Sequence, residues 1–260
     1  MMKETTLILF FHRERMTYRI TIVGGGIIGL TTACTILKEY ASVDTLKLTI
    51  IADAFSPETT GDVSGGFWEP YGLDLSDQRI MEWARYSYNI FLDEYFSSKA
   101  ARAGIMELSA YILKGQQVNS NDDTSSNPSF LSIVRHYRVL KSPEIDMFNH
   151  LGSIKGFVMS SIVAEVRRYL PELQRFLQQD SRVKFIKRKI CSLNELKNEA
   201  DVVINCTGLG AKDLVDDLTI RPARGQVRMR SINNVFLLYC YCLRLGHACS
   251  CSMDQIDVLF

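Results

Sequence analysis

Three glycines near the start of the chain have a spacing that suits nucleotide chemistry. Gly24, Gly26 and Gly29 form a G-x-G-x-x-G sequence, after a β-branched run (18–23) and before a stretch with helical spacing (30–40). In such a turn the first glycine permits a tight bend, the second lets the backbone approach a pyrophosphate, and the third lets helix and strand pack closely. The pyrophosphate then lies at the free amides and positive dipole end of the helix.

An acidic residue supports this interpretation. Asp53 ends a second predicted strand (46–53), at about the distance expected of the acid that binds a ribose hydroxyl. Strand, glycine turn, helix and second strand make a complete βαβ unit. The alternative is an ordinary glycine-rich turn in a doubly wound sheet, which the acid and its context disfavour. The unit does not by itself choose between NAD and FAD.

The composition is that of a packed globular protein. Of the 260 residues 47% are hydrophobic and 23% are charged, which excludes a disordered, collagen-like or coiled-coil chain. The formal net charge of +1 gives no global field that would attract phosphate backbones or anionic lipid. No run approaches the ~18 uncharged apolar residues of a membrane span. We therefore expect neither nucleic acid nor membrane as a partner.

The first residues are predicted to form a leader ahead of the folded domain. The apolar run 7–11 is shorter than a typical secretory signal, which needs ~7 to 15 apolar residues and a small-residue cleavage site. We expect an intracellular protein in which residues 1–17 precede the first strand, with Met16 as an alternative start.

The elements that would complete the domain follow the βαβ unit. A long irregular loop (56–71) of the length that tends to be functional comes directly after Asp53. The tail (231–260) is rich in Leu and Cys and shows no clear strand or helix period. Between them we expect, in order, a helix over 77–96, a strand over 105–113, a polar surface excursion over 115–128, a short helix over 142–148, a helix over 161–179 with a break at Pro171, and strands over 183–187 and 200–206.

The cysteines and histidines do not predict a metal centre or a hydrolase. Cys240 and Cys242, with His247 and two further cysteines, form a C-x-C cluster, but zinc knuckles use C-x2-C. The four histidines stand beside no Ser or Cys nucleophile motif, so a catalytic triad is not supported. No metal is expected, and no catalytic residue is assigned.

Two separated segments resemble the D-amino-acid oxidase and D-aspartate oxidase family. Residues 53–71, Asp-Ala-Phe-Ser-Pro-Glu-Thr-Thr-Gly-Asp-Val-Ser-Gly-Gly-Phe-Trp-Glu-Pro-Tyr, are similar to its D-x-F-x-P-x-T-T-x-D-V-A-A-G loop. Residues 201–210 and 221–227 are similar to its D-V-I-V-N-C-T/S-G and P-x-R-G-Q segments. The resemblance covers residues 18 to about 227 and implies a flavoprotein whose cofactor is FAD.

The resemblance also implies site residues. Thr59 and Thr60, with the small residues that follow, would lie along the flavin and its phosphates, and Glu69 stands where the mammalian oxidases have Gln. Ile190, beside Lys189, would pack by the adenine, and the turn at Thr207 would lie beneath the cofactor. The full set of expected cofactor-binding residues is Gly24, Gly26, Ile27, Ile28, Gly29, Asp53, Thr59, Thr60, Gly65, Gly66, Phe67, Ile190, Thr207 and Gly208.

The family's activity is oxidative deamination. Hydride leaves the Cα of a D-amino acid for the flavin, the imino acid hydrolyses to a 2-oxo acid and ammonia, and oxygen reoxidises the flavin to give hydrogen peroxide. The partners implied are a D-amino acid, neutral or acidic, and oxygen, and a homodimer is left open. The resemblance implies a role in D-amino acid metabolism in the peroxisome. The cytoplasm is the alternative, because residues 258–260 are not an S-K-L type signal.

The expected fold is α/β. A Rossmann-type FAD-binding domain (18–72 and 157–227) is expected with a discontinuous, incomplete α+β substrate domain (73–156) and a divergent tail (228–260). After Gln226 the sequence no longer resembles the family, whose substrate-binding arginine and tyrosines come later. Three alternatives therefore stand: a flavin oxidase of D-amino acids, a nicotinamide-dependent dehydrogenase, and a catalytically inactive truncated family member.

Overall fold

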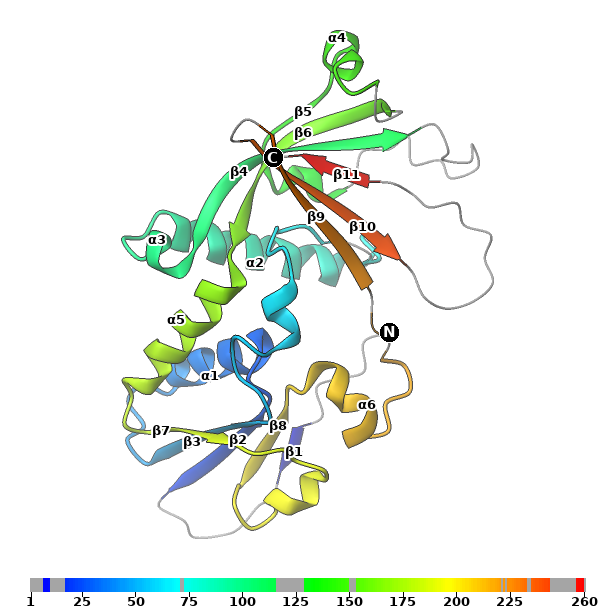
Figure 1. Ribbon diagram of the computed structural model, residues 1–260. Helices are drawn as coiled ribbons and strands as arrows, with labels where there is room; N and C mark the ends of the chain where they lie inside the picture. The colour runs from blue at the N-terminus through cyan, green and yellow to red at the C-terminus, as the bar shows by residue number, and fades with distance from the viewer. Residues whose placement is uncertain are drawn as a thin grey trace. The chain divides into compact units, whose positions relative to one another are not determined.

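The structure is a computed structural model, and it divides into two compact units, each built from two separated segments (Figure 1). Unit 1 comprises Met1–Ser64 and Val166–Pro222, and unit 2 comprises Gly65–Glu165 and Ala223–Phe260. The boundaries between the units fall after Ser64, after Glu165 and after Pro222. The residues that the structure describes are 7–9, 17–70, 73–115, 129–149, 153–220, 222, 224–232, 235–243 and 256–259.

Unit 1 is built on a mostly parallel sheet. Its strands are rich in Val and Ile, as is usual for parallel strands that are covered on both faces. Four strands run parallel to their neighbours, and the short first strand pairs antiparallel at one edge. The order across the sheet is β1 (Leu7–Leu9), β8 (Val202–Asn205), β2 (Tyr18–Val23), β3 (Leu46–Ala52) and β7 (Val183–Lys187).

Two helices and the sheet form the main core of unit 1. Leu30 and Leu37 of α1 (Ile27–Glu39) pack with Leu170 and Leu177 of α5 (Val166–Gln178) and with strand residues such as Leu48. All five side chains are buried. Short turns complete the unit: η1 (Thr60–Val63), η4 (Leu193–Leu196), η5 (Gly208–Gly210) and α6 (Ala211–Leu214). This architecture confirms the α/β, Rossmann-type expectation.

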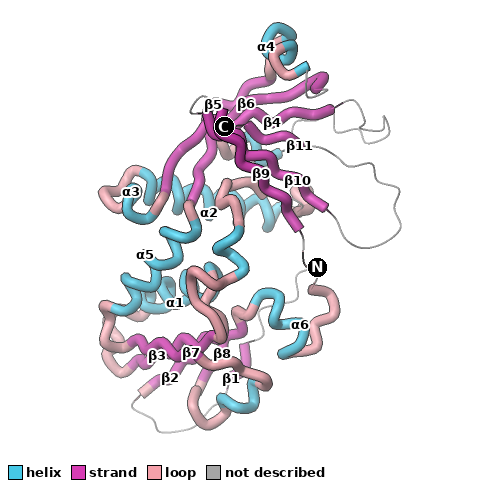
Figure 2. The backbone as a smooth tube through the Cα atoms, viewed as in Figure 1, coloured by secondary structure: helices cyan, strands magenta, loops and turns pink. Residues whose placement is uncertain are grey.

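Unit 2 contains an antiparallel sheet in the order β11 (Ile256–Leu259), β4 (Ile105–Gly115), β6 (Ser153–Ala164) and β5 (Arg135–Val139). Its helices, coloured cyan in Figure 2, include the long α2 (Gln78–Tyr95), which agrees with the predicted helix. The remaining elements are α3 (Ala100–Ala103), η2 (Ser129–Ser132), α4 (Ser142–Asp146) and a hairpin of β9 (Arg224–Ile232) with β10 (Val235–Leu243).

Three sequence-based predictions are wrong. The leader was expected to precede the first strand, but Leu7–Leu9 forms β1 and pairs with the edge of β8. The helix predicted from residue 161 begins only at Val166, because residues 153–164 form β6, where the polar Ser160 and Ser161 are buried between two partner strands. That helix also runs through Pro171 without a break.

A further difference concerns the tail (231–260), whose sequence shows no clear strand or helix period. Its residues contribute to β9, β10 and β11, because Val, Ile, Phe and Tyr favour strands even without a strict alternation. The predicted surface excursion beyond Gly115 lies outside the described residues.

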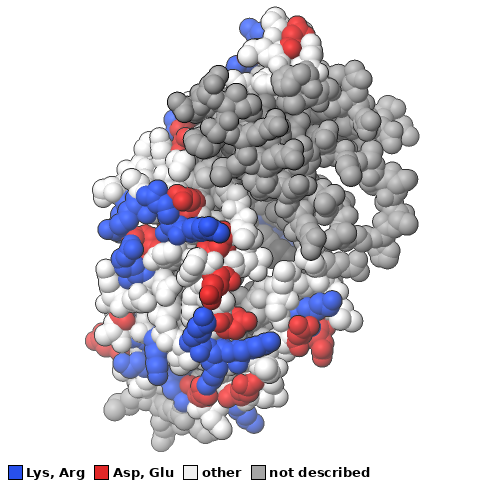
Figure 3. Space-filling view, viewed as in Figure 1, with Lys and Arg blue, Asp and Glu red and all other residues white. Residues whose placement is uncertain are grey.

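On the face drawn in Figure 3, the described residues show no large field of one sign. Lys and Arg side chains are interspersed with Asp and Glu over the visible face (Figure 3), in agreement with the small net charge. Among the described residues no helix is long and apolar enough to cross a membrane. Within the same residues no group of His, Cys, Asp and Glu is arranged to hold a metal ion, and the cysteine cluster of the tail lies outside them in part.

Candidate dinucleotide site

The candidate site lies at the carboxyl edge of the unit 1 sheet, where ligands bind in open α/β sheets. Hydrogen bonds between backbones hold the strand ends together at this edge. Gly24 N donates to Ile51 O at 2.8 Å, and Cys206 N donates to Val23 O at 2.8 Å. Beyond β3, Arg188 N donates to the carbonyl of the last β3 residue at 2.8 Å. The segments that follow the parallel strands β8, β2, β3 and β7 therefore start side by side.

The glycine turn after β2 cannot carry side chains at two of its positions. Gly24 has φ +128°, and a Cβ there would lie 2.2 Å from the carbonyl oxygen of Cys206. A Cβ on Gly29 would lie 2.0 Å from the carbonyl oxygen of Gly24. Both contacts are with backbone, which cannot move aside as a flexible side chain could. These glycines therefore permit the close packing of the turn, the first turn of α1 and β8.

Gly26 differs from its neighbours, because a Cβ there would meet nothing within 4 Å. It is the N-cap residue of α1, whose N-terminus has no side-chain cap and no acidic residue in its first turn. Ile27 and Ile28 follow, and Ile28 is 62% exposed. Because the first amides of a helix have no intrahelical acceptor, they are available to an anion at this open position. A pyrophosphate fits this arrangement.

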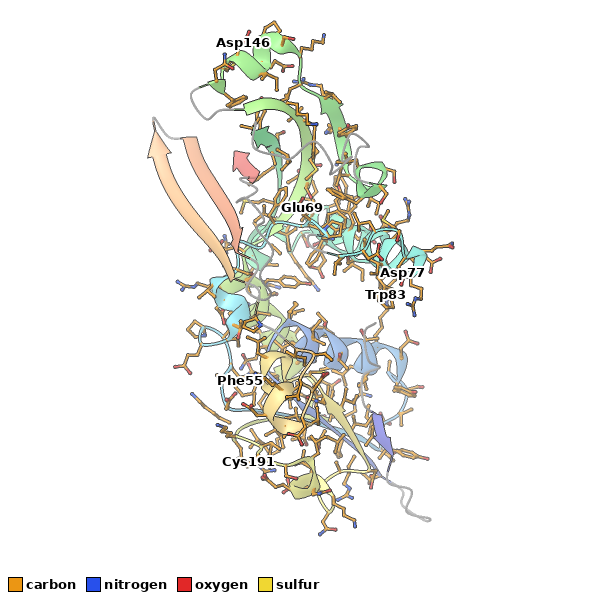
Figure 4. All side chains as sticks on the ribbon, turned by 90° about the vertical axis from the view of Figure 1, so that its right-hand side faces the viewer. Phe55, Glu69, Asp77, Trp83, Asp146 and Cys191 are labelled. Carbon is orange, nitrogen blue, oxygen red and sulfur yellow. The ribbon has the colours of Figure 1, made fainter. Side chains whose placement is uncertain are left out.

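Phe55, in the segment that follows β3, packs against the glycine turn. A Cβ on Gly25 would lie 2.5 Å from the Phe55 ring, and this ring packs edge-on against Phe185 of β7 with 5.6 Å between centroids. Figure 4 labels Phe55, which belongs to unit 1. Asp53, two residues before it, is exposed and follows the last residue of β3. The acid and the turn thus come from adjacent parallel strands.

The loop of residues 56–64, which we call the threonine loop, is organised around Asp62. This carboxylate is only 4% exposed. Ser56 Oγ donates to it at 2.6 Å, and Thr59 donates through both its backbone N, at 2.9 Å, and its Oγ1, at 2.6 Å. Thr60 is exposed. The resemblance gives Thr59 and Thr60 the same role, but their hydroxyl groups differ in the structure. The Thr59 hydroxyl donates to Asp62, whereas Thr60 is exposed.

Two further segments follow β7 and β8. Ile190 is 9% exposed, and its side chain lies in a core cluster. A ligand could therefore contact its backbone rather than its side chain. The neighbouring Lys189 is exposed. After β8, Asn205 Oδ1 accepts hydrogen bonds from Thr207 N at 3.1 Å and from Thr207 Oγ1 at 2.7 Å. Gly208 follows with φ +55° and open space around its Cβ position.

Three expected site residues belong to unit 2. Gly66 has φ +67°, its carbonyl accepts from Ala164 N at 2.9 Å, and a Cβ on it would lie 2.0 Å from the Ala164 carbonyl oxygen. Phe67 forms a β-bridge with Val163. Gly65, which precedes Gly66 and Phe67, is exposed. These residues are fixed to β6. These three residues belong to unit 2, whereas the glycine turn belongs to unit 1.

Glu69, labelled in Figure 4, has a perturbed acidity. It follows Trp68, whose N donates to Ile162 O at 2.8 Å and whose Nε1 donates to Ser87 Oγ at 3.0 Å. Ser161 Oγ in turn donates to the Trp68 carbonyl at 2.8 Å. Burial raises the pKa of Glu69 from its ordinary 4.5 to about 7. The Glu69 carboxyl is therefore poorly hydrated, and it follows a residue that hydrogen bonds fix in place.

Sequence reasoning did not identify Asp62, Asn205 or Arg167 as part of the site. The first two have local signals, since Thr59-x-x-Asp62 and Asn205-x-Thr207 are spacings at which short polar side chains bind nearby backbone. Arg167 has none, because its Nε donates to the Asp62 carbonyl, at 3.2 Å, from 105 residues away.

A glycine turn, an uncapped helix N-terminus and an acid at the carboxyl ends of adjacent parallel strands define a dinucleotide-binding protein of the doubly wound α/β class. Residues 19–231 match the sequence profile of a family described as FAD dependent oxidoreductase. The chain belongs to this family. The membership confirms the predicted family and FAD as its cofactor, and it disfavours the nicotinamide-dependent alternative.

The chain is similar to proteins that are named as oxidases. The chain is 32% identical over 212 residues to the D-aspartate oxidase of Homo sapiens, covering 81% of this chain and 59% of that protein. It is 29% identical over 211 residues to the D-amino acid oxidase of Dugesia ryukyuensis, covering 80% and 60%. The chain thus spans about 60% of the length of these relatives.

Solved structures agree on the fold. The L-amino acid deaminase from Proteus myxofaciens in complex with anthranilate aligns with a TM-score of 0.57 at 11% identity, covering 92% of this chain and 62% of that one. The L-amino acid deaminase from Proteus vulgaris aligns with a TM-score of 0.52 at 11% identity, covering 92% and 61%. At this identity the likeness concerns the fold alone.

Proposed function

We propose that unit 1 binds FAD at the carboxyl edge of its sheet. The observation that carries the proposal is the glycine turn, with packed glycines at 24 and 29 and open space at Gly26 before an uncapped helix N-terminus. The amides of Ile27 and Ile28 would donate to the pyrophosphate, and Asp53 would accept from a ribose hydroxyl. The exposed Thr60 hydroxyl and the backbone at Ile190 and Gly208 remain available to the rest of the cofactor.

We further propose that the whole protein oxidises D-amino acids to 2-oxo acids, ammonia and hydrogen peroxide. Two relatives named for D-aspartate and D-amino acid oxidation support this activity. The flavin, when bound, supplies the hydride acceptor. The contribution of this chain is to bind and orient: it neutralises pyrophosphate charge at α1 and fixes the ribose with a carboxylate. No side chain among the described residues is assigned a catalytic role.

The test is the visible absorption spectrum of the purified chain with added FAD, followed by anaerobic addition of D-aspartate and then D-alanine. A flavin band that stays with the protein on gel filtration supports the binding site. Bleaching by one amino acid supports oxidation and identifies an acidic or neutral substrate. Retained flavin that neither substrate bleaches would favour the inactive family member, and failure to retain flavin would overturn the binding proposal.

Location and assembly are proposed on the family resemblance alone. A peroxisomal location predicts that an N-terminally labelled chain coincides with a peroxisomal marker, and a diffuse label would favour the cytoplasm. Light scattering on the purified chain decides between a monomer and a homodimer.

A further inference from the structure

Asp62 is a buried carboxylate that accepts three hydrogen bonds. Its Oδ1 accepts from Ser56 Oγ, and its Oδ2 accepts from Thr59 N and Oγ1. Burial alone would raise its pKa, but the hydrogen bonds from Ser56 and Thr59 and the nearby guanidinium of Arg167 outweigh burial and lower the pKa below its ordinary 3.8. The carboxylate is therefore ionised at neutral pH and only accepts, so all three donors must point inward.

The same residue connects the threonine loop to the helical layer. Arg167, in the first turn of α5, donates through Nε to the Asp62 carbonyl. The Cβ position of the neighbouring Gly61 lies 3.6 Å from Val166 Cγ1 and 3.8 Å from Leu170 Cδ1. The loop thus contacts the first turns of α5 through a hydrogen bond and apolar packing.

Helix α5 in turn packs against the helix that starts at the glycine turn. Leu170 and Leu177 of α5 share a buried cluster with Leu30 and Leu37 of α1. The threonine loop and the glycine turn are therefore both fixed to one pair of packed helices. The Asp62 carboxylate holds the loop together through Ser56 and Thr59, and the Asp62 backbone carbonyl accepts the hydrogen bond from α5.

We propose that Asp62 is a positioning residue for the flavin: it holds the threonine loop so that Thr60 and the loop backbone face the cofactor. The inference rests on the proposed function, since it requires that FAD binds at this edge. A residue that acts only on stability would change the melting temperature of the chain without changing the affinity of the folded protein for FAD.

The experiment measures the Kd for FAD of the full 260-residue chain by quenching of flavin fluorescence, well below the melting temperature. Asp62→Ala should weaken FAD binding about tenfold or more, the change expected when about one charge-assisted hydrogen bond is lost. Asp180→Ala is the matched control, because Asp180 is a unit 1 carboxylate that pairs with Arg182 at 2.7 Å outside the loop. It should lower the melting temperature and leave the Kd unchanged.

Thr59→Val provides a second route, because it removes a donor to Asp62 without removing the charge. Combined with Asp62→Ala it should add little further loss of affinity, since the two changes break the same contact. If circular dichroism shows that Asp62→Ala does not fold, Asp62→Asn and Thr59→Val decide, since both keep the size of the side chain.

The outcomes separate the two proposals. A wild-type chain that does not bind FAD overturns the proposed function. A wild-type chain that binds FAD, with variants at Asp62 and Thr59 that bind it equally well, overturns only the positioning role. Loss of affinity in Asp180→Ala as large as that in Asp62→Ala would also overturn it, because the effect would then follow general stability.

Discussion

Thr59 and Thr60 are adjacent and chemically alike, yet the structure gives them different tasks. The Thr59 hydroxyl donates to the buried Asp62, whereas Thr60 is exposed. We expect Thr60→Val to weaken FAD binding and to leave the stability of the flavin-free chain unchanged. Thr59→Val should lower the free energy of unfolding by about 1–3 kcal/mol, because it leaves part of a buried acceptor unsatisfied. FAD titration checks the effect of Thr60→Val on binding, and urea unfolding of the two flavin-free variants compares their stability. An equal loss of stability in both variants would contradict the difference between the two threonines.

At the same scale, Glu69 makes stability depend on pH. Its pKa is raised from 4.5 to about 7, so the folded protein keeps this proton at pH values where the unfolded chain has lost it. Its contribution is fully present below pH ~4.5 and is lost as the pH rises through about 7, which amounts to about 3 kcal/mol. Unfolding between pH 5 and pH 8 should show this decline in the wild type. Glu69→Gln should flatten it, and a decline of the same size in that variant would assign it to another group.

At the scale of elements, the glycine turn supplies a matched pair of substitutions. Gly29→Ala puts a methyl group 2.0 Å from the Gly24 carbonyl oxygen, so we expect a loss of about 1–3 kcal/mol in the free energy of unfolding. Gly26→Ala meets nothing within 4 Å and should fold normally, but its methyl group would occupy the open space offered to the pyrophosphate and weaken FAD binding. Thermal unfolding and flavin titration separate the two, and a stable Gly29→Ala chain would contradict the packing argument.

Elements that depend on neighbours in the sequence could be predicted from it, whereas elements that depend on distant partners could not. The βαβ unit around Gly24 has a local pattern, so β2, α1 and β3 were predictable. Residues 161–164 were predicted as the start of a helix. Only the pairing of β6 with β4 and β5 explains why Ser160 and Ser161 are buried there. For the site, the threonine loop could be predicted by resemblance, but its contact with Arg167 could not, because it spans 105 residues.

At the scale of the whole molecule, each unit is completed by a second segment far along the chain. Val166–Pro222 supplies α5, β7 and β8 to unit 1, and Ala223–Phe260 supplies β11 to the sheet of unit 2. Neither unit can therefore be produced as one continuous fragment, and binding studies need the full chain. The assignment of FAD rests on the family match of residues 19–231, because the glycine turn alone does not choose between NAD and FAD. The substrate stays a proposal, because no described side chain is assigned to it.

The pairing of β1 with β8 has a consequence for solubility. Ile8 lies opposite Val203, so the first residues of the chain cover an edge of a sheet whose strands are rich in Val and Ile. A chain that starts at Met16 would leave the N–H and C=O groups of that edge free to pair with another molecule. We expect deletion of residues 1–15 to cause concentration-dependent self-association, measured by light scattering. If the truncated chain stays as monodisperse as the full one, pairing with β1 is not needed to prevent self-association. If it self-associates, the first residues protect the β8 edge from pairing between molecules.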